Sequence, residues 1–259
     1  MVKAILQGVL RSAPLKPVRN LLRPLVSRWA RPVPVKLACG YVCYVDLRSA
    51  IGRGLLVKGD FDPALGQFID SVLQPGGVFL DVGANVGYFS LRALARVGAA
   101  GEVHAFEMEA RSLRCLDDTK RKGKLDNLTV HKTAVGDREG TVGVVSAAEI
   151  GQSWVNPHGT GVTMRPLDAW LPEFEGKRLQ LIKIDVEGME FKVLQGARQL
   201  LTRHRPIVVS EALEMTMDRF QEKPDDLISY MAGLGYRKSD LAGTNDTNWV
   251  FTPVERSPR

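Results

Sequence analysis

The chain has 259 residues, of which 44% are hydrophobic and 25% charged, a composition typical of an ordinary soluble globular protein. Its length suffices for one large α/β domain with a buried core and a short appendage. No apolar run approaches the ~20 residues that a membrane-spanning helix needs, and the distribution of the +6 formal charge does not indicate a nucleic-acid-binding enzyme.

The excess positive charge lies in an N-terminal arm, which we place at residues 1–40. Residues 1–45 contain eight basic residues and no acidic one, which leaves 27 of the 35 basic residues against all 29 acidic ones. Apolar residues of the arm recur at helical spacing, namely Val18, Leu21, Leu22, Leu25, Val26 and Trp29. The resulting basic amphipathic helix fits a peripheral contact with an anionic membrane, a targeting presequence, or packing on the domain's own core.

Residues 41–259 are predicted to form one α/β domain, preceded by an extended, proline-bearing linker at residues 31–36. A short strand is expected at 41–47, followed by a helix that Asp62 caps and Pro63 begins. Downstream, the pattern predicts strands at 78–81, 102–106, 128–133, 141–145, 179–184 and 206–209, helices at 86–97, 110–122, 188–200, 213–221 and 225–234, and a closing β pair at 235–238 and 249–252. Such alternation predicts a doubly wound, mostly parallel sheet with helices on both faces.

A glycine-containing loop follows the strand at 78–81, where doubly wound sheets bind their ligands. Asp81, Gly83 and Gly87 form the pattern Asp-x-Gly-x-x-x-Gly. Gly83 permits a tight turn and a close approach of the ligand, and Asp81 is placed to bind a cationic amine or to fix the loop. A dinucleotide-binding loop would require G-x-G-x-x-G and a helix end free for a pyrophosphate. The pattern therefore favours S-adenosylmethionine over a nicotinamide cofactor.

Glu107 supports the same interpretation. It ends the next strand, 24 residues beyond Gly83. A carboxylate at that position can accept hydrogen bonds from both ribose hydroxyls of a nucleoside ligand.

The chain resembles the FkbM family of S-adenosylmethionine-dependent methyltransferases over roughly residues 58–252. The matching segments are Gly77-Val-Phe-Leu-Asp-Val-Gly-Ala-Asn-Val-Gly-Tyr-Phe-Ser90, His104-Ala-Phe-Glu107, Thr133-Ala-Val-Gly-Asp137, Leu181-Ile-Lys-Ile-Asp-Val-Glu-Gly-Met-Glu190, Val193-Leu-Gln-Gly-Ala197 and Pro206-Ile-Val-Val-Ser-Glu211. The chain departs from the family pattern at Met108, where proline is usual, and at Asp62, where glutamate is common.

The resemblance implies a Rossmann-like class I methyltransferase fold, whose seven-stranded, mostly parallel sheet has one antiparallel edge strand. It also implies which residues border the cofactor. The methionine end would contact Asp81, Gly83, Ala84, Asn85 and Gly87, the ribose would contact Glu107, and the adenine would lie beside Ala134, Val135 and Asp137.

Three carboxylates near the expected cleft are candidate general bases for a hydroxyl acceptor. Asp185 follows the strand at 179–184, Glu187 lies two residues on, and Glu211 follows the strand at 206–209. Asp185 with Glu211 is alternatively a candidate Mg²⁺ site, because that cation takes oxygen ligands. His158, in a long glycine-containing loop, is a further candidate base, although a lone loop histidine is more often only exposed.

Two neighbouring charged residues receive structural interpretations. Glu190 is expected to stabilise a helix start, and Lys183 to reach the surface or to pair with an acid.

We therefore expect a cytoplasmic methyltransferase that modifies a hydroxyl of a sugar, a lipid-linked molecule or a secondary metabolite, with no nucleic-acid partner. A nitrogen or protein acceptor, and a non-catalytic membrane-tethered scaffold, are the alternatives. The acceptor pocket is expected to come from the loops at 46–62, 147–162 and 212–224. No feature of the sequence indicates the oligomeric state.

Overall fold

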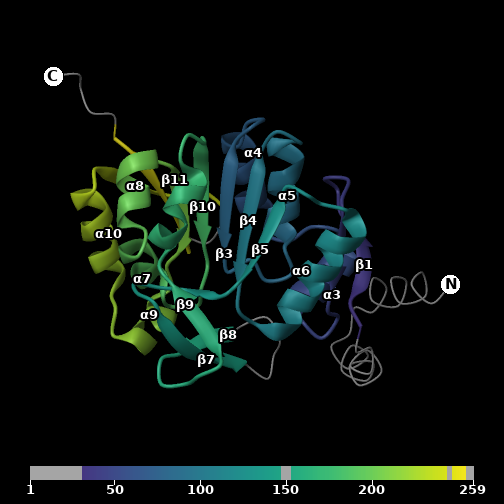
Figure 1. The fold of residues 1–259 in the computed structure, drawn as a ribbon, viewed down its shortest axis with the longest axis horizontal. Coiled ribbons are helices and arrows are strands. Elements are labelled where there is room, and N and C mark those ends of the chain that lie inside the picture. The colour runs from purple at the N-terminus through teal and green to yellow at the C-terminus, as the bar shows by residue number, and fades with distance from the viewer. Residues whose placement is uncertain (1–30, 147–152, 244–246, 255–259) are drawn as a thin grey trace.

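A seven-stranded sheet forms the centre of the molecule (Figure 1). The structure is a computed structural model, and it describes residues 31–146, 153–243 and 247–254. The strands are β3 (Val78–Val82), β4 (Glu102–Glu107), β5 (Leu128–Lys132), β10 (Leu179–Ile184), β11 (Ile207–Glu211), β12 (Tyr236–Asp240) and β13 (Asn248–Pro253), in the order β12-β13-β11-β10-β3-β4-β5. From β11 to β5 every neighbouring pair is parallel, so the predicted fold class is confirmed.

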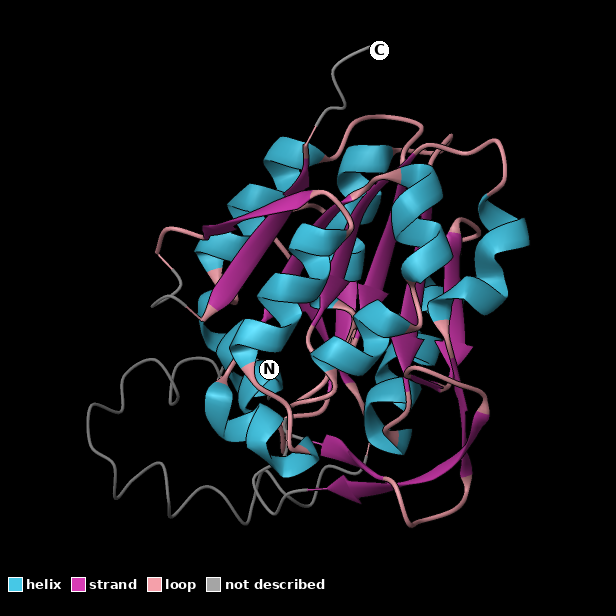
Figure 2. Ribbon diagram, turned by 90° about the vertical axis from the view of Figure 1, so that its left-hand side faces the viewer, coloured by secondary structure: helices cyan, strands magenta, loops and turns pink. Residues whose placement is uncertain are grey.

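Helices cover both faces of this sheet (Figure 2). Successive strand residues point to opposite faces, so Phe79 and Leu181 belong to one core cluster and Leu80 and Ile182 to the other. The first face packs against α3 (Ala50–Lys58), α4 (Pro63–Val72), α5 (Tyr88–Val97) and α6 (Ala110–Gly123). The second packs against the 3₁₀ helix η1 (Leu167–Phe174) and against α7 (Glu190–Gln195), α8 (Arg198–His204), α9 (Glu214–Met217) and α10 (Pro224–Gly233). Burial on both faces explains why β3 and β10 are entirely buried.

The reversed strand of the sheet is not at its edge, which corrects one expectation. β13 runs antiparallel to β11 on one side and to β12 on the other. The strand β12 forms the edge, and the chain returns from it to insert β13 beside β11. Asn248, the first residue of β13, is thereby paired with Glu211 at the carboxyl end of β11.

The segment before the sheet is more ordered than the sequence indicated. Part of the expected linker forms β1 (Val33–Lys36), which pairs antiparallel with β2 (Val42–Val45). The prolines permit this because β1 pairs with a single neighbour in the described chain. The helix α3 was not predicted, and Ser49 caps it by accepting a hydrogen bond from the Gly52 amide. Asp62 and Pro63 begin α4 as expected.

A small second sheet lies beyond the carboxyl ends of the central strands (Figure 1). It contains β6 (Ala134–Val135), β7 (Gly140–Ser146), β8 (Ser153–Asn156) and β9 (Val162–Arg165), in the order β6-β9-β7-β8. The strand predicted at 141–145 is confirmed as part of β7. The loop expected to follow it is partly strand, since β8 and β9 both pair with β7.

Two predicted helices are divided in the structure, and a third lies outside the described residues. The helix expected at 188–200 is interrupted at Gly196, where a Cβ would lie 2.0 Å from the carbonyl oxygen of Gly136. The helix expected at 213–221 divides into α9 and η2 (Asp218–Phe220). The amphipathic helix predicted around residues 18–29 lies outside the described residues. Within the described part of the chain, no helix combines the length and apolar character needed to cross a bilayer.

Candidate cofactor and acceptor site

A cavity of about 480 Å³ opens at the carboxyl ends of β3, β4, β10 and β11. This is the edge at which doubly wound sheets bind ligands. Its lining includes the loop after β3, the first residues of α5 and α6, the ends of β10 and β11, and parts of the segment at 46–65. Of the predicted site residues, it brings together Gly83, Ala84, Asn85, Glu107, Ala134, Val135, Asp185, Glu187 and Glu211.

The glycine loop has the close backbone contacts that its sequence predicted. Gly83 has a φ of +77°, and a Cβ there would lie 1.8 Å from the carbonyl oxygen of Asp185. Gly87 has a φ of +84°, and its Cβ would lie 2.4 Å from a side-chain carbon of Leu116. Gly87 thus allows α6 to pack closely against the loop. Gly87 itself does not line the cavity.

Glu107 is held rigidly at the end of β4. Its Oε1 accepts the backbone N–H groups of Met108 and Glu109 at 2.8 and 2.7 Å, and its Oε2 accepts that of Asn85 at 2.7 Å. Burial raises the pKa of Glu107, while the three amide donors act in the opposite direction. Oε1 already accepts two N–H groups, whereas Oε2 accepts one and can accept a further hydrogen bond, so Glu107 is preorganised to receive a ligand hydroxyl at Oε2.

The cavity lining beside Glu107 is apolar. Ala134 and Val135, which form β6, are buried apolar residues that line the cavity next to Phe106. Such a wall suits the face of a purine ring. Asp137 follows them but does not line the cavity, and its Oδ2 lies 3.2 Å from Arg138.

Asp81 is beneath the glycine loop and not in the cavity. Its side chain has no exposure; Oδ2 accepts a hydrogen bond from Ser90 at 2.6 Å, and Oδ1 lies 3.3 Å from Lys183 Nζ. Lys183 in turn donates to the carbonyl oxygen of Gly83 at 3.1 Å. Of the two interpretations of Asp81, this geometry supports the one in which it fixes the loop.

Lys183 lines the cavity, although the sequence indicated only a structural role for it. It is 3% exposed, so the expectation that it reaches the surface is wrong, whereas the alternative that it pairs with an acid is confirmed. Its Nζ also lies 3.4 Å from Asp185 Oδ2 and it lines the cavity. Although burial alone would lower it, the carboxylates of Asp185 and Asp81 raise the pKa of Lys183, so the ammonium stays charged.

The three candidate bases form one acidic group opposite the glycine loop. Burial first, and then repulsion from Asp185, raise the pKa of Glu211 to about 9, and the same two causes raise the pKa of Glu187 to about 7. A hydrogen bond with Asp185 contributes further to the shift at Glu211. Near neutral pH, Glu211 therefore keeps its proton, and its neighbour Asp185 lies 3.4 Å from Lys183 Nζ.

The turn after β10 holds this acidic group in place. Glu187 and Gly188 both have positive φ values, +59° and +115°, and a Cβ at Gly188 would lie 2.2 Å from the carbonyl oxygen of Thr216. Glu190, 1% exposed, accepts the backbone N–H groups of Val186 and Gly188 through Oε1. The structural role expected for Glu190 is confirmed, and it is exerted on this turn at the start of α7.

Three aromatic residues form an aromatic wall of the cavity, and Phe89 among them lies beside Lys183. Phe61, Tyr88 and Phe89 line the cavity and meet edge to face, with ring centroids 5.0 to 6.5 Å apart. The Tyr88 hydroxyl donates to Asp60 and accepts from Arg92. Of the three loops expected to form the acceptor pocket, the one at 46–62 supplies Phe61 and further lining residues, whereas 212–224 supplies none. The further residues are Asp46, Ser49, Ala50, Ile51 and Arg53.

His158 does not reach the cavity. It is exposed in the turn between β8 and β9, where its backbone N–H donates to Asn156 Oδ1 at 3.1 Å. Instead, Ser153 and Val155 of β8 line the cavity.

A parallel sheet with a glycine loop after its first strand and a fixed carboxylate after its second defines the class I methyltransferase fold, as the sequence predicted. The chain belongs to the FkbM methyltransferase family, because residues 81–238 match the model of the Methyltransferase FkbM domain. The resemblance noted from the sequence is thereby confirmed.

Comparison with individual proteins gives one curated relative. The chain is 29% identical over 161 residues to the 2-O-methyltransferase NoeI of Sinorhizobium fredii, an alignment that covers 54% of this chain and 65% of that protein. The match thus spans somewhat less than two thirds of the relative's length.

Solved structures with similar folds include a methyltransferase FkbM from Methylobacillus flagellatus KT, at 17% identity, with a TM-score of 0.47 and coverage of 90% of this chain and 59% of that one. They also include the fibrillarin of Aeropyrum pernix in complex with S-adenosyl-L-methionine, at 11% identity, with a TM-score of 0.42 and coverage of 70% and 67%. Both TM-scores lie below 0.5, and the family assignment rests on the family match alone.

Proposed function

We propose that this protein transfers a methyl group from S-adenosylmethionine to a hydroxyl group of a sugar or another small ring-shaped metabolite. The observation that carries the proposal is the position of Glu107, which three backbone amides fix in a cavity that Asp185 also lines. Glu107 suits the ribose diol of the cofactor, and Asp185 suits the role of accepting the proton of the acceptor hydroxyl.

The cofactor supplies an electrophilic methyl group on a sulfonium. The chain's own residues would hold it as follows. Glu107 accepts a hydrogen bond from the ribose diol at Oε2, Ala134 and Val135 contact the adenine, and the backbone at Gly83 borders the methionine portion. Asp81 acts through Lys183, which fixes the carbonyl group of Gly83.

Asp185 is the proposed general base. In the transfer, the acceptor oxygen forms a bond to the methyl carbon, the carbon–sulfur bond breaks with its electron pair remaining on sulfur, and the hydroxyl proton passes to Asp185. Lys183 Nζ lies 3.4 Å from Asp185 Oδ2, and Glu211, whose pKa is raised to about 9, retains its own proton beside it. Positioning of the hydroxyl against the methyl group would provide most of the rate enhancement.

A divalent cation on Asp185 and Glu211 is the second candidate for activating the hydroxyl. Two carboxyl groups in contact suit Mg²⁺ or a similar cation through their oxygen atoms. The Lys183 ammonium already supplies positive charge at this place, which disfavours another cation. We therefore favour proton transfer to Asp185 without a bound cation.

The aromatic wall is the argument for a ring-shaped acceptor. Phe61, Tyr88 and Phe89 present ring edges and faces to the cavity, and Arg53 and Asp46 add polar groups next to them. Apolar C–H faces and hydroxyl groups alternate on a sugar, and a surface that mixes aromatic and polar groups matches both. The curated relative, named as a 2-O-methyltransferase, agrees with a hydroxyl acceptor.

The direct test is calorimetric titration of S-adenosylmethionine into the wild type and into Glu107→Gln and Asp185→Asn, with Glu175→Gln as the matched control on an exposed acid. Glu107→Gln should weaken binding about 10- to 100-fold, since a charged acceptor is lost, whereas Glu175→Gln should bind as the wild type does. Transfer of labelled methyl groups to a panel of sugars, alcohols and amines, with chelator or with Mg²⁺, then identifies the acceptor class.

Asp185→Asn should retain cofactor binding and lose transfer. Absence of cofactor binding to a folded wild type would refute the proposal. Transfer to amines alone would refute the hydroxyl acceptor, and activity abolished by chelator and restored by Mg²⁺ would favour the cation on Asp185 and Glu211.

A further inference from the structure

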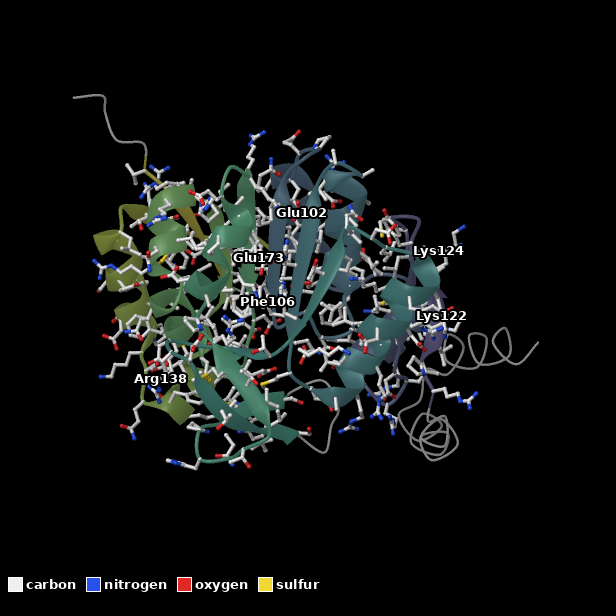
Figure 3. All side chains as sticks on the ribbon, in the orientation of Figure 1. Glu102, Phe106, Lys122, Lys124, Arg138 and Glu173 are labelled. Atoms are coloured by element: carbon white, nitrogen blue, oxygen red, sulfur yellow. The ribbon has the colours of Figure 1, made fainter. Side chains whose placement is uncertain are left out.

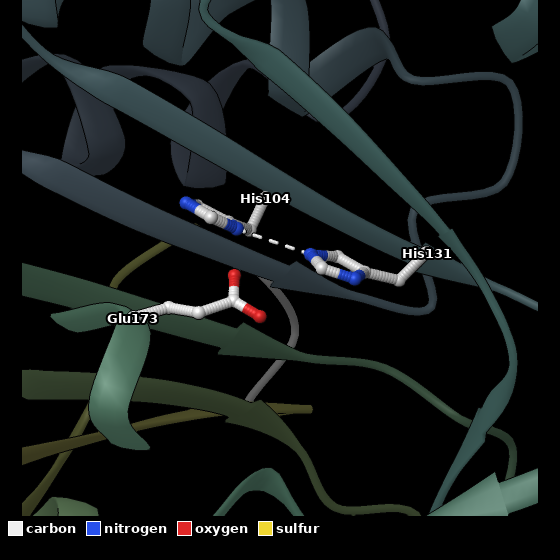
Figure 4. A group of neighbouring side chains, drawn as sticks. All are labelled: His104, His131 and Glu173. Carbon is white, nitrogen blue, oxygen red and sulfur yellow. Dashed lines mark hydrogen bonds between the residues drawn. The ribbon is translucent and has the colours of Figure 1, made fainter. Parts of the chain in front are cut away.

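A second group of ligand-type side chains lies at the edge of the sheet, outside the cavity described above. It consists of His104 on β4, His131 on β5 and Glu173 on η1, whose potential ligand atoms all lie within 4.8 Å of one another. Figure 4 shows the Glu173 carboxylate directed at the two imidazole rings. Among the described residues, these three are the set of His, Cys, Asp or Glu side chains that lie close enough together to hold one metal ion.

We propose that His104, His131 and Glu173 form a binding site for a transition-metal ion of the Zn²⁺ type, in which the ion cross-links η1 to the β4–β5 edge of the sheet. Two imidazoles and one carboxylate, completed by water, are a usual ligand set for this ion. The three residues come from separate segments of the chain, so the fold, and not local sequence, creates the site.

The distance between the imidazoles supports the assignment. His104 Nδ1 lies 3.0 Å from His131 Nε2. Two ligands of a tetrahedral ion with bonds of about 2.1 Å stand about 3.4 Å apart, so the rings need to separate by only a few tenths of an ångström. Glu173 is exposed, and its side chain is free to approach by the remaining distance.

The second nitrogen of His104 also has the partner that metal-binding histidines commonly use. His104 Nε2 lies 3.2 Å from Glu102 Oε2, and Lys177 Nζ donates to the same oxygen at 2.8 Å. A carboxylate on the far nitrogen fixes the ring and its tautomer, which leaves the lone pair of Nδ1 directed at the ion.

The aromatic residues around the group make it rigid. His131 stacks on Phe106, with ring centroids 4.3 Å apart and an interplanar angle of 10°, and Trp170 of η1 packs against both rings. His104 meets Phe174 edge to face. Figure 3 places Glu102 and Phe106 toward opposite ends of β4, with Glu173 beside that strand. Because Phe106 also lines the cavity and precedes Glu107, an ion here would stiffen the wall behind the cofactor.

The test is titration of chelator-treated, tag-free protein with Co²⁺, followed by its visible absorption, and competition by Zn²⁺. The wild type should take up one equivalent and show the intense bands of a tetrahedral nitrogen- and oxygen-ligated Co²⁺, and Zn²⁺ should displace it. His131→Asn and Glu173→Gln should each weaken binding at least tenfold, in keeping with the loss of a ligand.

Two control variants remove similar groups elsewhere. His204→Asn removes the histidine at the end of α8, and Glu175→Gln removes an exposed acid near Glu173. Both should bind Co²⁺ as the wild type does, and circular dichroism should show all four variants folded.

Three results would overturn the proposal. The first is absence of uptake by the folded wild type, and the second is uptake unaffected by both His131→Asn and Glu173→Gln. The third is a spectrum with only the weak bands of octahedral oxygen ligation, which would place the ion at the carboxyl groups of the cavity. None of these measurements depends on methyl transfer, so the proposal can fail while the proposed function stands.

Discussion

The Nζ atom of Lys183 lies 3.3 Å from Oδ1 of Asp81, and both side chains are buried in the middle of the parallel sheet. The two residues occupy paired positions of neighbouring strands, since Lys183 of β10 is in register with Asp81 of β3. One ion pair therefore joins the glycine loop, through the carbonyl group of Gly83, to the acidic group that begins at Asp185.

Replacing Lys183 with methionine should be strongly destabilising. The change would leave Asp81 as an uncompensated buried charge, which costs about 3–5 kcal/mol in the free energy of unfolding. Denaturant unfolding measures the loss, and Lys132→Met, which removes an exposed pairing with Asp117, should cost about 1 kcal/mol or less. Equal losses in the free energy of unfolding for the two substitutions would show that the buried ion pair contributes no more to stability than the exposed one.

Alanine should be tolerated at one glycine with a positive φ and not at Gly83 of the glycine loop. Gly83→Ala forces a Cβ into a left-handed conformation and against the Asp185 carbonyl oxygen, so we expect a loss of roughly 3 kcal/mol and of cofactor binding. Gly59→Ala, at the end of α3, provides the matched control, because Gly59 is left-handed with a φ of +73° but a Cβ there meets nothing within 4 Å. It should cost roughly 1 kcal/mol and leave cofactor affinity intact. Calorimetry and thermal unfolding of both variants check this contrast.

The buried carboxyl of Glu211 should make the protein less stable as the pH rises. Its pKa is about 9 in the folded chain and near the ordinary glutamate value of about 4.3 in the unfolded chain. Between these values the folded state holds the extra proton, so the free energy of unfolding falls with increasing pH across this window. Glu211→Gln removes the ionisation and should flatten the fall, by on the order of 1–3 kcal/mol at its upper end.

Urea unfolding of both proteins between pH 5 and 9 measures this effect. Glu175→Gln, on an exposed acid, should keep the slope of the wild type. A slope that is the same in Glu211→Gln would show that Glu211 is ionised in the folded protein at neutral pH.

Phe61 should affect the acceptor and not the cofactor. The residue belongs to the aromatic wall and is 36% exposed, so its truncation removes contact area without opening the core. Under the proposed function, Phe61→Ala should raise KM for the acceptor up to about tenfold, the value of one aromatic contact, with unchanged affinity for S-adenosylmethionine. Met215→Ala, on a residue that is 75% exposed and outside the cavity, is the control. A change in cofactor affinity instead would move Phe61 to the cofactor half of the cavity.

Much of the fold was predictable because its signals are local. β3 and β10 are rich in apolar residues, and Asp62 followed by Pro63 marks the start of α4. The helix α3 carries no such signal, since Gly52 and Gly54 lie within it and weaken its intrinsic preference. Its existence depends on contacts with distant segments, where Leu55 and Leu56 enter the core.

The site was predictable where backbone geometry dictates residue type, and less so where pairing decides. Gly83 and Glu107 occupy positions that few other residues could fill, and both line the cavity. Lys183 sits in a buried strand for a reason visible only in three dimensions, because its partner is about a hundred residues away in sequence and lies on the adjacent strand. His158 was a candidate general base because of its imidazole, but it is exposed in the turn between β8 and β9 and does not line the cavity.

The antiparallel insertion of β13 has a consequence for the order in which the protein can become functional. Thr247 and Asn248 line the cavity beside Glu211, although they are among the last described residues of the chain. A ribosome releases the glycine loop and Glu107 long before it releases these residues, so a nascent chain can assemble the cofactor half of the cavity first. The acceptor half is closed only when the strand that runs against all the others has been synthesised and inserted.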